Sequence, residues 1–352
     1  MTRGGPWAHV GLAAAAIAAA AVVSDPAPAV EELFSFADRA IDESSGLALQ
    51  DGLVLTVNDS GGDPVVYAVD PGTGETVGRT TYTADEVEDV EALAVGPDGT
   101  VWVGDIGDNG AERSSVAVYA VPPVGRGDHT VEAPSYELTY RDGAHNAETL
   151  LADPRDGRLY VVTKELFGGG NVFAAPRRLD EDRSNALEKV GHVKGLLTDG
   201  TFTADGRHAL LRGYGRVWLA DADTWRSAAT MPLPPQRQGE GIAVTDDPES
   251  FLVSSEGART PVLTVPMDEE LRDALASDGP AGPRAGSGEG SQAGVAGGAT
   301  RQDGSDADQP GVFNLHGRAL KLAAALVVLV AVGIAAGVRF LRGGRRRSRW
   351  TR

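Results

Sequence analysis

The sequence predicts an all-β fold, a single β-propeller, and three observations support this. A strand–turn–strand unit recurs five times between Ser45 and Val265, and its successive starts lie 41 to 57 residues apart. That spacing suits a propeller blade of four antiparallel strands. Strands such as Leu53–Val57 and Leu159–Val162 are bounded by glycine, proline, asparagine or aspartate, as strands usually are. No helical stripe of ten or more residues occurs inside the domain.

The five units start at Ser45, Glu91, Glu148, Asp199 and Glu240. The last unit lacks a clear fourth strand, and we expect Glu32–Phe36 at the other end of the domain to supply it and to close the ring. Closure removes open sheet edges, which invite aggregation. We count five blades. A sixth blade, hidden by sequence divergence, is an alternative. A large β-sandwich or two small sandwiches are the alternative, although sandwiches lack repeats of this length.

The amino-terminal segment predicts export. An apolar, alanine-rich run of 14 residues, 10–23, follows Arg3, and Ala27-Pro28-Ala29 offers the small residues that a signal peptidase recognises. Residues 1–29 are therefore predicted to be a signal peptide, cleaved before Val30. The run is shorter than the roughly 20 residues of a membrane span. An uncleaved amino-terminal anchor is the alternative.

The carboxyl-terminal segments predict a membrane anchor. Residues 276–318, rich in glycine, serine, alanine and aspartate, are too poor in large apolar residues to form a core and are predicted to be a disordered stalk after the propeller of residues 30–275. Residues 319–338 have the length and apolarity of a transmembrane helix, and the tail, 339–352, contains seven arginines and no acidic residue. The positive-inside rule then predicts a single-pass type I protein of the cell membrane, with its large domain outside.

Charge and cysteine content exclude several classes of partner and site. The chain carries a net charge of −18, to which the residues outside 30–320 contribute +8, so residues 30–320 carry −26. Such an excess disfavours nucleic acid and favours cations or basic partners. The chain contains no cysteine, which excludes disulfides and thiolate metal sites.

Several short motifs resemble those of a known group of proteins. They are ESSGLA (43–48), NDSGG (58–62), EDVEALA (88–94), GDIGDN (104–109), AETLLADP (147–154), TKE (163–165) and QGEGIA (238–243). Together they resemble uncharacterised actinobacterial propeller proteins, secreted or membrane-anchored, that are distantly similar to NHL and YVTN-type propellers. The resemblance spans roughly 42–265 and implies the fold, but that group has no agreed activity. A fainter similarity of GEGIA to phytase-like propellers implies a calcium-dependent hydrolase.

The repeat starts supply the first candidate site. The first strand of each blade lines the central channel, so Glu91, Glu148 and Glu240 are expected to converge there with Ser45 and Asp199, and with Glu43 nearby. Carboxylates that face one channel repel each other unless a cation or a proton relieves them, and calcium prefers such oxygen ligands. Glu91, Glu148 and Glu240 are therefore the predicted calcium ligands. The alternative is that each glutamate caps backbone amides or points to solvent, because a one-residue error in register would turn it away.

A second set of polar residues follows the next strand of each unit, 13 to 17 residues after each start. It comprises Asn58, Asp59, Asp105, Lys164, Glu165, Arg212 and Glu256, which are expected to surface on one face and to contact a polar ligand. Asx turns explain Asn58 and Asp59 equally well.

The sequence thus favours a surface-displayed propeller that binds a ligand or a protein partner, and no catalytic residue is assigned. The alternative function is a calcium-dependent hydrolase of an ester or phosphoester, with calcium held by Glu91, Glu148 and Glu240. A metal enzyme requires several carboxylates around one ion, whereas a binding protein does not.

Overall fold

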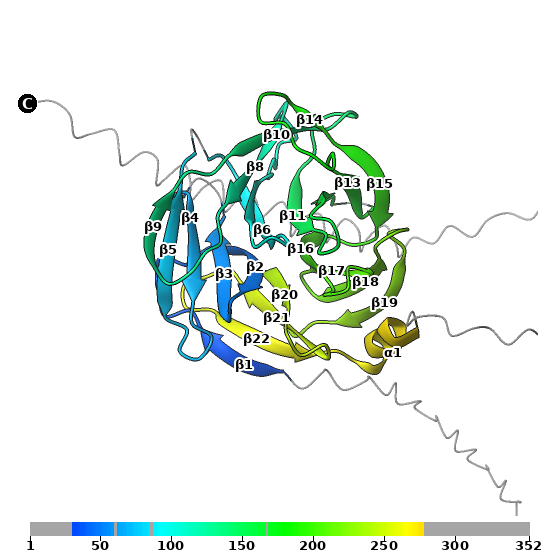
Figure 1. The fold of residues 1–352 in the computed structure, drawn as a ribbon. Helices are drawn as coiled ribbons and strands as arrows, with labels where there is room; N and C mark the ends of the chain where they lie inside the picture. Colours follow the sequence, from blue (N-terminus) through cyan, green and yellow to red (C-terminus); the bar gives the residue numbers. More distant parts are fainter. Residues whose placement is uncertain (1–29, 60–61, 85–86, 167, 278–352) are drawn as a thin grey trace, which may run out of the picture. The chain divides into compact units, whose positions relative to one another are not determined.

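Five β-sheets stand around one axis in the computed structural model of the chain, which describes residues 30–59, 62–84, 87–166 and 168–277 (Figure 1). The innermost strands contact one another in the order β2, β6, β11, β16 and β20, and β20 contacts β2 again, so the ring is closed. The predicted single propeller is confirmed with five blades in the described residues. The sandwich alternative is wrong, because each repeat forms its own sheet instead of sharing two packed sheets.

Each blade begins with its inner strand and runs outward through antiparallel neighbours. Blade 1 contains β2 (Ser44–Gln50), β3 (Leu53–Asn58), β4 (Val65–Val69) and β5 (Thr76–Tyr82). Blade 2 contains β6 (Val90–Val95), β7 (Val101–Asp105), β8 (Val116–Val121) and β10 (Ser135–Thr139). Blade 3 contains β11 (Ala147–Ala152), β12 (Leu159–Thr163), β13 (Gly170–Ala174) and β15 (Glu188–Val193). Blade 4 contains β16 (Leu197–Phe202), β17 (His208–Gly213), β18 (Arg216–Asp221) and β19 (Ser227–Pro232).

Two of the sheets contain a fifth, outermost strand, which comes from the chain segment of the following blade. β9 (Gly127–Val131) pairs in parallel with β5 of blade 1, and the short β14 (Asn185–Ala186) pairs in parallel with β10 of blade 2. The sequence analysis missed both strands, because β9 is almost entirely exposed and β14 has two residues, so neither shows an alternating apolar pattern. They cover edges that would otherwise be open.

Blade 5 is completed by the amino-terminal strand of the domain. It contains β20 (Gly239–Val244), β21 (Ser250–Ser255) and β22 (Pro261–Pro266), and β1 (Glu31–Ser35) pairs antiparallel with β22 as the outer strand. Figure 1 shows β1 in dark blue beside β22 in yellow. The predicted closing strand at 32–36 is thus confirmed, one residue earlier than expected.

The apolar cores lie between neighbouring blades. Phe34, Phe36, Leu47 and Val54 belong to one core cluster with Val262, so residues of blade 1 and of the closing strand pack together. The rings of Phe34 and Phe36 meet edge to face, with 5.5 Å between centroids. The closing strand is therefore held by its side chains as well as by its backbone pairing.

One helix, α1 (Glu269–Ser277), follows the last strand and packs beside β19. Its first turn is capped by Asp268, whose Oδ1 accepts a hydrogen bond of 2.9 Å from the Leu271 N–H. The helix was not predicted, since its nine residues bury a single leucine, and it extends two residues into the segment that was predicted as stalk. No described helix is long and apolar enough to cross a membrane. The predicted signal peptide, transmembrane helix and tail lie outside the described residues.

The closing strand generates the first prediction. Replacing the fully buried Phe36 by alanine should lower the free energy of unfolding by about 3–5 kcal/mol, because it empties a packed site between blades 1 and 5. Chemical denaturation of the full chain measures the change. The matched control is Leu33→Ala on β1, three residues before Phe36, where the leucine is 41% exposed and little should change. Equal stability of the Phe36→Ala variant and the parent would contradict the closing role.

Candidate functional site

Every inner strand carries a β-bulge near its first residue. The register breaks between Ser45 and Leu47, Val90 and Ala92, Ala147 and Thr149, Leu197 and Asp199, and Gly239 and Ile242. In blades 2 and 3 the unpaired position holds Glu91 or Glu148, and in blade 5 the two unpaired positions hold Glu240 and Gly241. A bulge redirects the side chain of its extra residue. The repeated bulge therefore places three glutamates alike at one end of the channel, where each is at most 5% exposed.

The predicted equivalence of the repeat starts is off by one residue in two blades. The bulge position is Gly46 instead of Ser45 in blade 1, and Thr198 instead of Asp199 in blade 4. Asp199 is paired with Arg212 of β17 and is fully buried, and its Oδ2 accepts a hydrogen bond of 2.8 Å from the Ile242 N–H of blade 5. Asp199 therefore ties two blades together. A bulge cannot be located from the apolar pattern, which explains the error.

Lys164 is the cation of this end of the channel. It follows β12, and its Nζ contacts the Glu148 carboxylate in an ion pair and donates a hydrogen bond of 2.9 Å to Tyr214 Oη. The same ammonium lies 5.2 Å from the centroid of the Tyr214 ring. Burial lowers the pKa of Lys164, but Glu148 and Glu240 overcome this effect and raise it. Lys164 is therefore charged and partly neutralises two of the glutamates.

Six acidic side chains lie at this end of the channel, and we call them the axial carboxylate cluster: Asp59, Asp89, Glu91, Glu148, Glu240 and Glu256. Lys164 interacts with four of them, Glu91, Glu148, Glu240 and Glu256. The pKa of Glu148 is raised to about 8, by burial first and then by Glu240 and Asp59, against the opposing effect of Lys164. The pKa of Glu256 is also raised to about 8, by burial first and then by Glu240, Asp59 and the exposed Glu43. Asp59 likewise raises the pKa of Glu91 and Glu240, after burial. One lysine does not offset so many carboxylates, so the cluster attracts protons and other cations.

Arg212 was expected on the surface, but the structure buries it completely. Its guanidinium donates to the Ser254 carbonyl oxygen at 2.7 Å and also bonds the Gly241 carbonyl and Gln236 Oε1. Burial lowers its pKa to about 10, while Glu240 and Asp199 oppose the change. A Cβ at Gly239 would lie 1.9 Å from Arg212 Nη2, so blade 5 requires glycine there. Arg212 is therefore an internal cross-link between blades 4 and 5, not a surface ligand.

Asp105 was also expected on the surface, and it too is buried. Its carboxylate accepts hydrogen bonds from the backbone N–H groups of Glu88 at 2.9 Å and Asp89 at 3.0 Å, and it forms an ion pair of 2.8 Å with Arg113. Asp105 thus orients the loop that enters blade 2. Its role is to position Asp89, which the sequence analysis did not single out.

The remaining predicted residues lie at the same end of the blades. Glu165 is half-buried in the loop after β12, where its Oε1 accepts a hydrogen bond of 2.6 Å from Asn171 Nδ2. Asn58 Nδ2 donates to the Ala40 carbonyl oxygen at 2.6 Å, and the Asp59 N–H donates to the Glu43 carbonyl oxygen at 2.8 Å. These local bonds account for Asn58, the last residue of β3, and for Glu165 in its loop. Asp59 and Glu256 are the two that join the cluster.

The carboxylates that meet most closely are those of Asp59, Asp89 and Glu91. Each offers one oxygen atom, and the three oxygens lie within 4.8 Å of one another. Among the described residues, this is the one group of acidic or histidine side chains with such geometry. Of the predicted calcium ligands it contains Glu91 but neither Glu148 nor Glu240. The missed Asp89 lies two residues before Glu91, inside the EDVEALA motif, and that proximity was the available signal.

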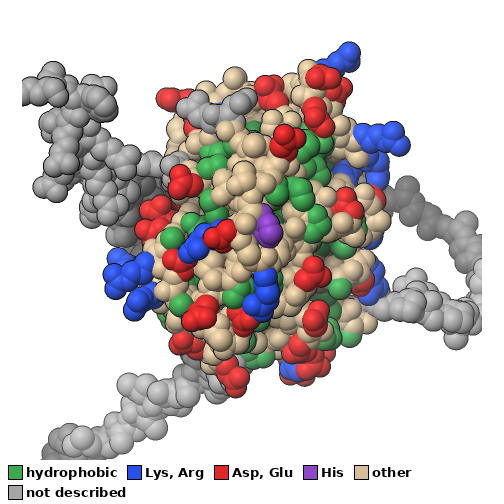
Figure 2. All heavy atoms as spheres, turned by 60° about the vertical axis from the view of Figure 1, so that its left-hand side comes forward, with side chains coloured by type: hydrophobic (Ala, Val, Ile, Leu, Met, Phe, Trp, Pro, Cys, Tyr) green, Lys and Arg blue, Asp and Glu red, His purple; other side chains and the backbone are tan. Residues whose placement is uncertain are grey.

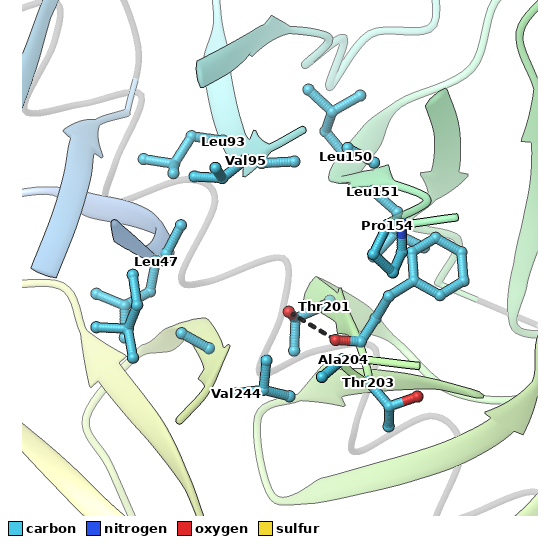
Figure 3. A pocket seen from close by; sticks show the side chains of 17 residues that line it. Leu47, Leu93, Val95, Leu150, Leu151, Pro154, Thr201, Thr203, Ala204 and Val244 are labelled. Carbon is cyan, nitrogen blue, oxygen red and sulfur yellow. Dashed lines mark hydrogen bonds between the residues drawn. The ribbon is translucent and has the colours of Figure 1, made fainter. Parts of the chain in front are cut away.

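The other end of the channel is apolar. Leu47, Leu93, Leu150 and Val244, further along the inner strands, line a cavity of about 230 Å³ with Phe202. Figure 3 shows labelled side chains from all the blades surrounding this opening, with Thr201 and Thr203 among its polar members. The two ends of the channel therefore differ in chemistry, one charged and one apolar. By contrast, Figure 2 shows acidic and basic side chains interspersed on the side that carries β9.

Comparison with known proteins shows no family for the chain. No family model matches the chain, and no curated protein matches it. Among solved structures, the chain is similar to a gluconolactonase from Xanthomonas campestris, with 14% identity and a TM-score of 0.44 over 68% of this chain and 90% of that one. It is also similar to a chain in the nidogen/laminin complex, with 14% identity and a TM-score of 0.40 over 62% of this chain and 74% of that one. The propeller fold rests on the five sheets of the structure, and the resemblance to actinobacterial and phytase-like groups stays a prediction.

The raised pKa values generate a prediction about pH. A carboxyl group with a higher pKa in the folded state binds its proton more tightly there, so its stabilising effect is complete below the ordinary value of 4.5 and is lost as the pH rises through about 8. The melting temperature of the full chain should therefore fall between pH 5 and pH 9. Glu256→Gln, which cannot ionise, should make the decline shallower.

The control for the pH series is Glu137→Gln, which removes an exposed carboxylate from β10. This variant should reproduce the pH dependence of the parent. An identical decline in the Glu256→Gln and Glu137→Gln variants would show that the cluster does not hold a proton near neutral pH.

Proposed function

We propose that the chain is a membrane-anchored, extracytoplasmic propeller that binds a positively charged ligand or protein partner at the acidic end of its channel. The observation that carries this proposal is the axial carboxylate cluster, in which six acidic side chains lie at one end of the channel and one lysine, Lys164, interacts with four of them. Complementary charge speeds encounter and selects a basic partner over an acidic one. The net charge of −26 on residues 30–320 also favours a basic partner.

Two exposed apolar side chains support a protein partner at this end. Tyr214, which contacts Lys164, is 39% exposed, and Leu166, two residues after Lys164, is 63% exposed. They are two of the four large apolar side chains that are exposed in the described residues. Aromatic residues beside a polar rim are typical anchors of protein interfaces. A basic segment with one apolar side chain fits both features.

A calcium-dependent hydrolase of an ester or phosphoester is the second candidate. The observation that favours it is Glu148, whose pKa of about 8 near Lys164 and Tyr214 suits a general acid at neutral pH. Turnover of p-nitrophenyl phosphate or p-nitrophenyl acetate by the full chain in calcium, lost in the Glu148→Gln variant, would favour the hydrolase over the binding protein.

The binding role predicts a site-specific loss of affinity. Fluorescence anisotropy at pH 9, above the pKa of about 8 of Glu256, should show that the full chain in detergent binds a labelled octalysine peptide at low salt. A double variant, Glu43→Gln with Glu256→Gln, should weaken binding by about tenfold, since two charges facing the ligand are removed. The matched control, Asp128→Asn with Glu137→Gln, removes two exposed charges on outer strands. Equal weakening in both variants would mean that only the overall charge attracts the peptide.

The predicted topology is tested separately. Protease added to intact cells should release a fragment of roughly residues 30–290, because the arginine-rich tail is expected to stay in the cytoplasm. Immunoblotting with antibodies against the propeller and against the tail follows the two parts. Full protection of the propeller until the cells are lysed would contradict the extracytoplasmic location.

A further inference from the structure

We infer that Asp59, Asp89 and Glu91 form a divalent-cation site, with calcium as the ligand, at the mouth of blades 1 and 2. The inference deepens the proposed binding role, since it names a ligand of the same end of the channel. Oxygen ligands lie about 2.4 Å from calcium, so oxygens on opposite sides of one ion are about 4.8 Å apart. The three carboxylate oxygens meet that limit. One oxygen from each residue can therefore bind one ion, and solvent can fill the remaining positions.

The backbone at each ligand is held in place. The Asp89 N–H is bonded to buried Asp105, and the Gly107 N–H donates to the Asp89 carbonyl oxygen at 3.0 Å. Glu91 occupies the bulge of β6, and the Asp59 N–H is bonded to the Glu43 carbonyl oxygen. Three carboxylates that repel one another are thus held together by the surrounding structure, an arrangement that a bound cation stabilises.

Gly107 leaves the space that this arrangement needs. A Cβ at this residue would lie 2.5 Å from Asp89 Oδ2 and 2.8 Å from Glu91 Cγ. Any other residue at 107 would push both carboxylates away. The glycine of the GDIGDN motif therefore permits the close approach of two of the three ligands.

A second observation is a buried acceptor at the same end of the channel. Glu240 is 3% exposed, and its Oε2 is buried without a hydrogen-bond partner. Lys164 interacts with the carboxylates of Glu148 and Glu240. Arg212 interacts with those of Glu240 and Asp199. A divalent ion on Asp59 would reduce the negative potential at this orphan oxygen. A nearby positive charge lowers the free-energy cost of burying the Glu240 carboxylate.

The choice of calcium follows from the ligand types. The three ligands are carboxylates, which hard cations prefer, and neither histidine nor cysteine belongs to the group. Calcium accepts carboxylates in irregular geometry, whereas magnesium demands a regular octahedron and keeps most of its water. Three carboxylates on three separate loops and strands suit the less demanding ion.

The test is calorimetric titration of calcium chloride into the metal-free full chain in detergent, with sodium chloride holding the ionic strength constant. We expect one calcium per chain. Asp89→Asn should weaken the affinity at least about tenfold, because one of three charged ligands is lost. The control, Asp128→Asn, removes an exposed carboxylate on β9 and should leave the affinity unchanged. Gly107→Ala should also weaken the affinity, although it alters no charge.

Four results would overturn the site. The first is that the folded parent binds no calcium, and the second is that Asp89→Asn and Asp128→Asn weaken the calcium affinity equally. The third is that Glu148→Gln weakens the calcium affinity more than Asp89→Asn does. The fourth is that the chain binds magnesium more tightly than calcium. Melting curves establish that each variant is folded, and if Gly107→Ala fails to fold, Asp89→Asn still decides. If the parent binds octalysine but not calcium, the cation site alone is overturned. If the parent binds calcium but not octalysine, the basic-partner proposal is overturned and the cation site is retained.

Discussion

Closure of five blades around one axis is the constraint on which the rest of this structure depends. Each inner strand contacts its two neighbours, and β16 also contacts β2 across the ring, so little space remains at the centre. The ring closes through the pairing of β1 with β22, which joins the first and last strands of the domain. Without disulfides, the domain relies on this pairing and on the apolar cores between blades.

The narrow channel determines how the charged residues are accommodated. Charges removed from water are costly unless they are paired or hydrogen-bonded. Arg212 meets this requirement with carbonyl oxygens of blade 5, and Asp199 with an amide of the same blade. Both residues therefore fasten neighbouring blades. The carboxylates near Lys164 are less completely compensated, and this imbalance makes that end of the channel a candidate site rather than a structural cross-link.

The bulges connect the fold to the candidate function. The same irregularity recurs at the start of all five inner strands, but glutamate occupies it only in blades 2, 3 and 5. Blades 1 and 4 place Gly46 and Thr198 there, so the glutamates are distributed unevenly around the ring. Since propellers host many unrelated activities, the argument for function rests on this asymmetric set of side chains and not on the fold.

The sequence by itself determined the features that depend on local pattern. The alternating strands and their blade-length repeat predicted five sheets, the unmatched strand at 32–36 predicted the closing strand, and the repeated glutamates predicted that Glu91, Glu148 and Glu240 share one end of the channel. Strand periodicity and turn residues act over a few neighbours, so they can be recognised without the fold.

Only the tertiary structure decided the contacts between residues that are distant in sequence. It showed that Arg212 and Asp105 are buried, that β9 and β14 belong to the preceding blades, and that Asp59 of blade 1 meets Asp89 and Glu91 of blade 2. A one-residue bulge changes the direction of a side chain without changing the apolar pattern, so Ser45 and Asp199 were misaligned. The distance between two blades depends on how the whole ring packs, and no local run of residues encodes it.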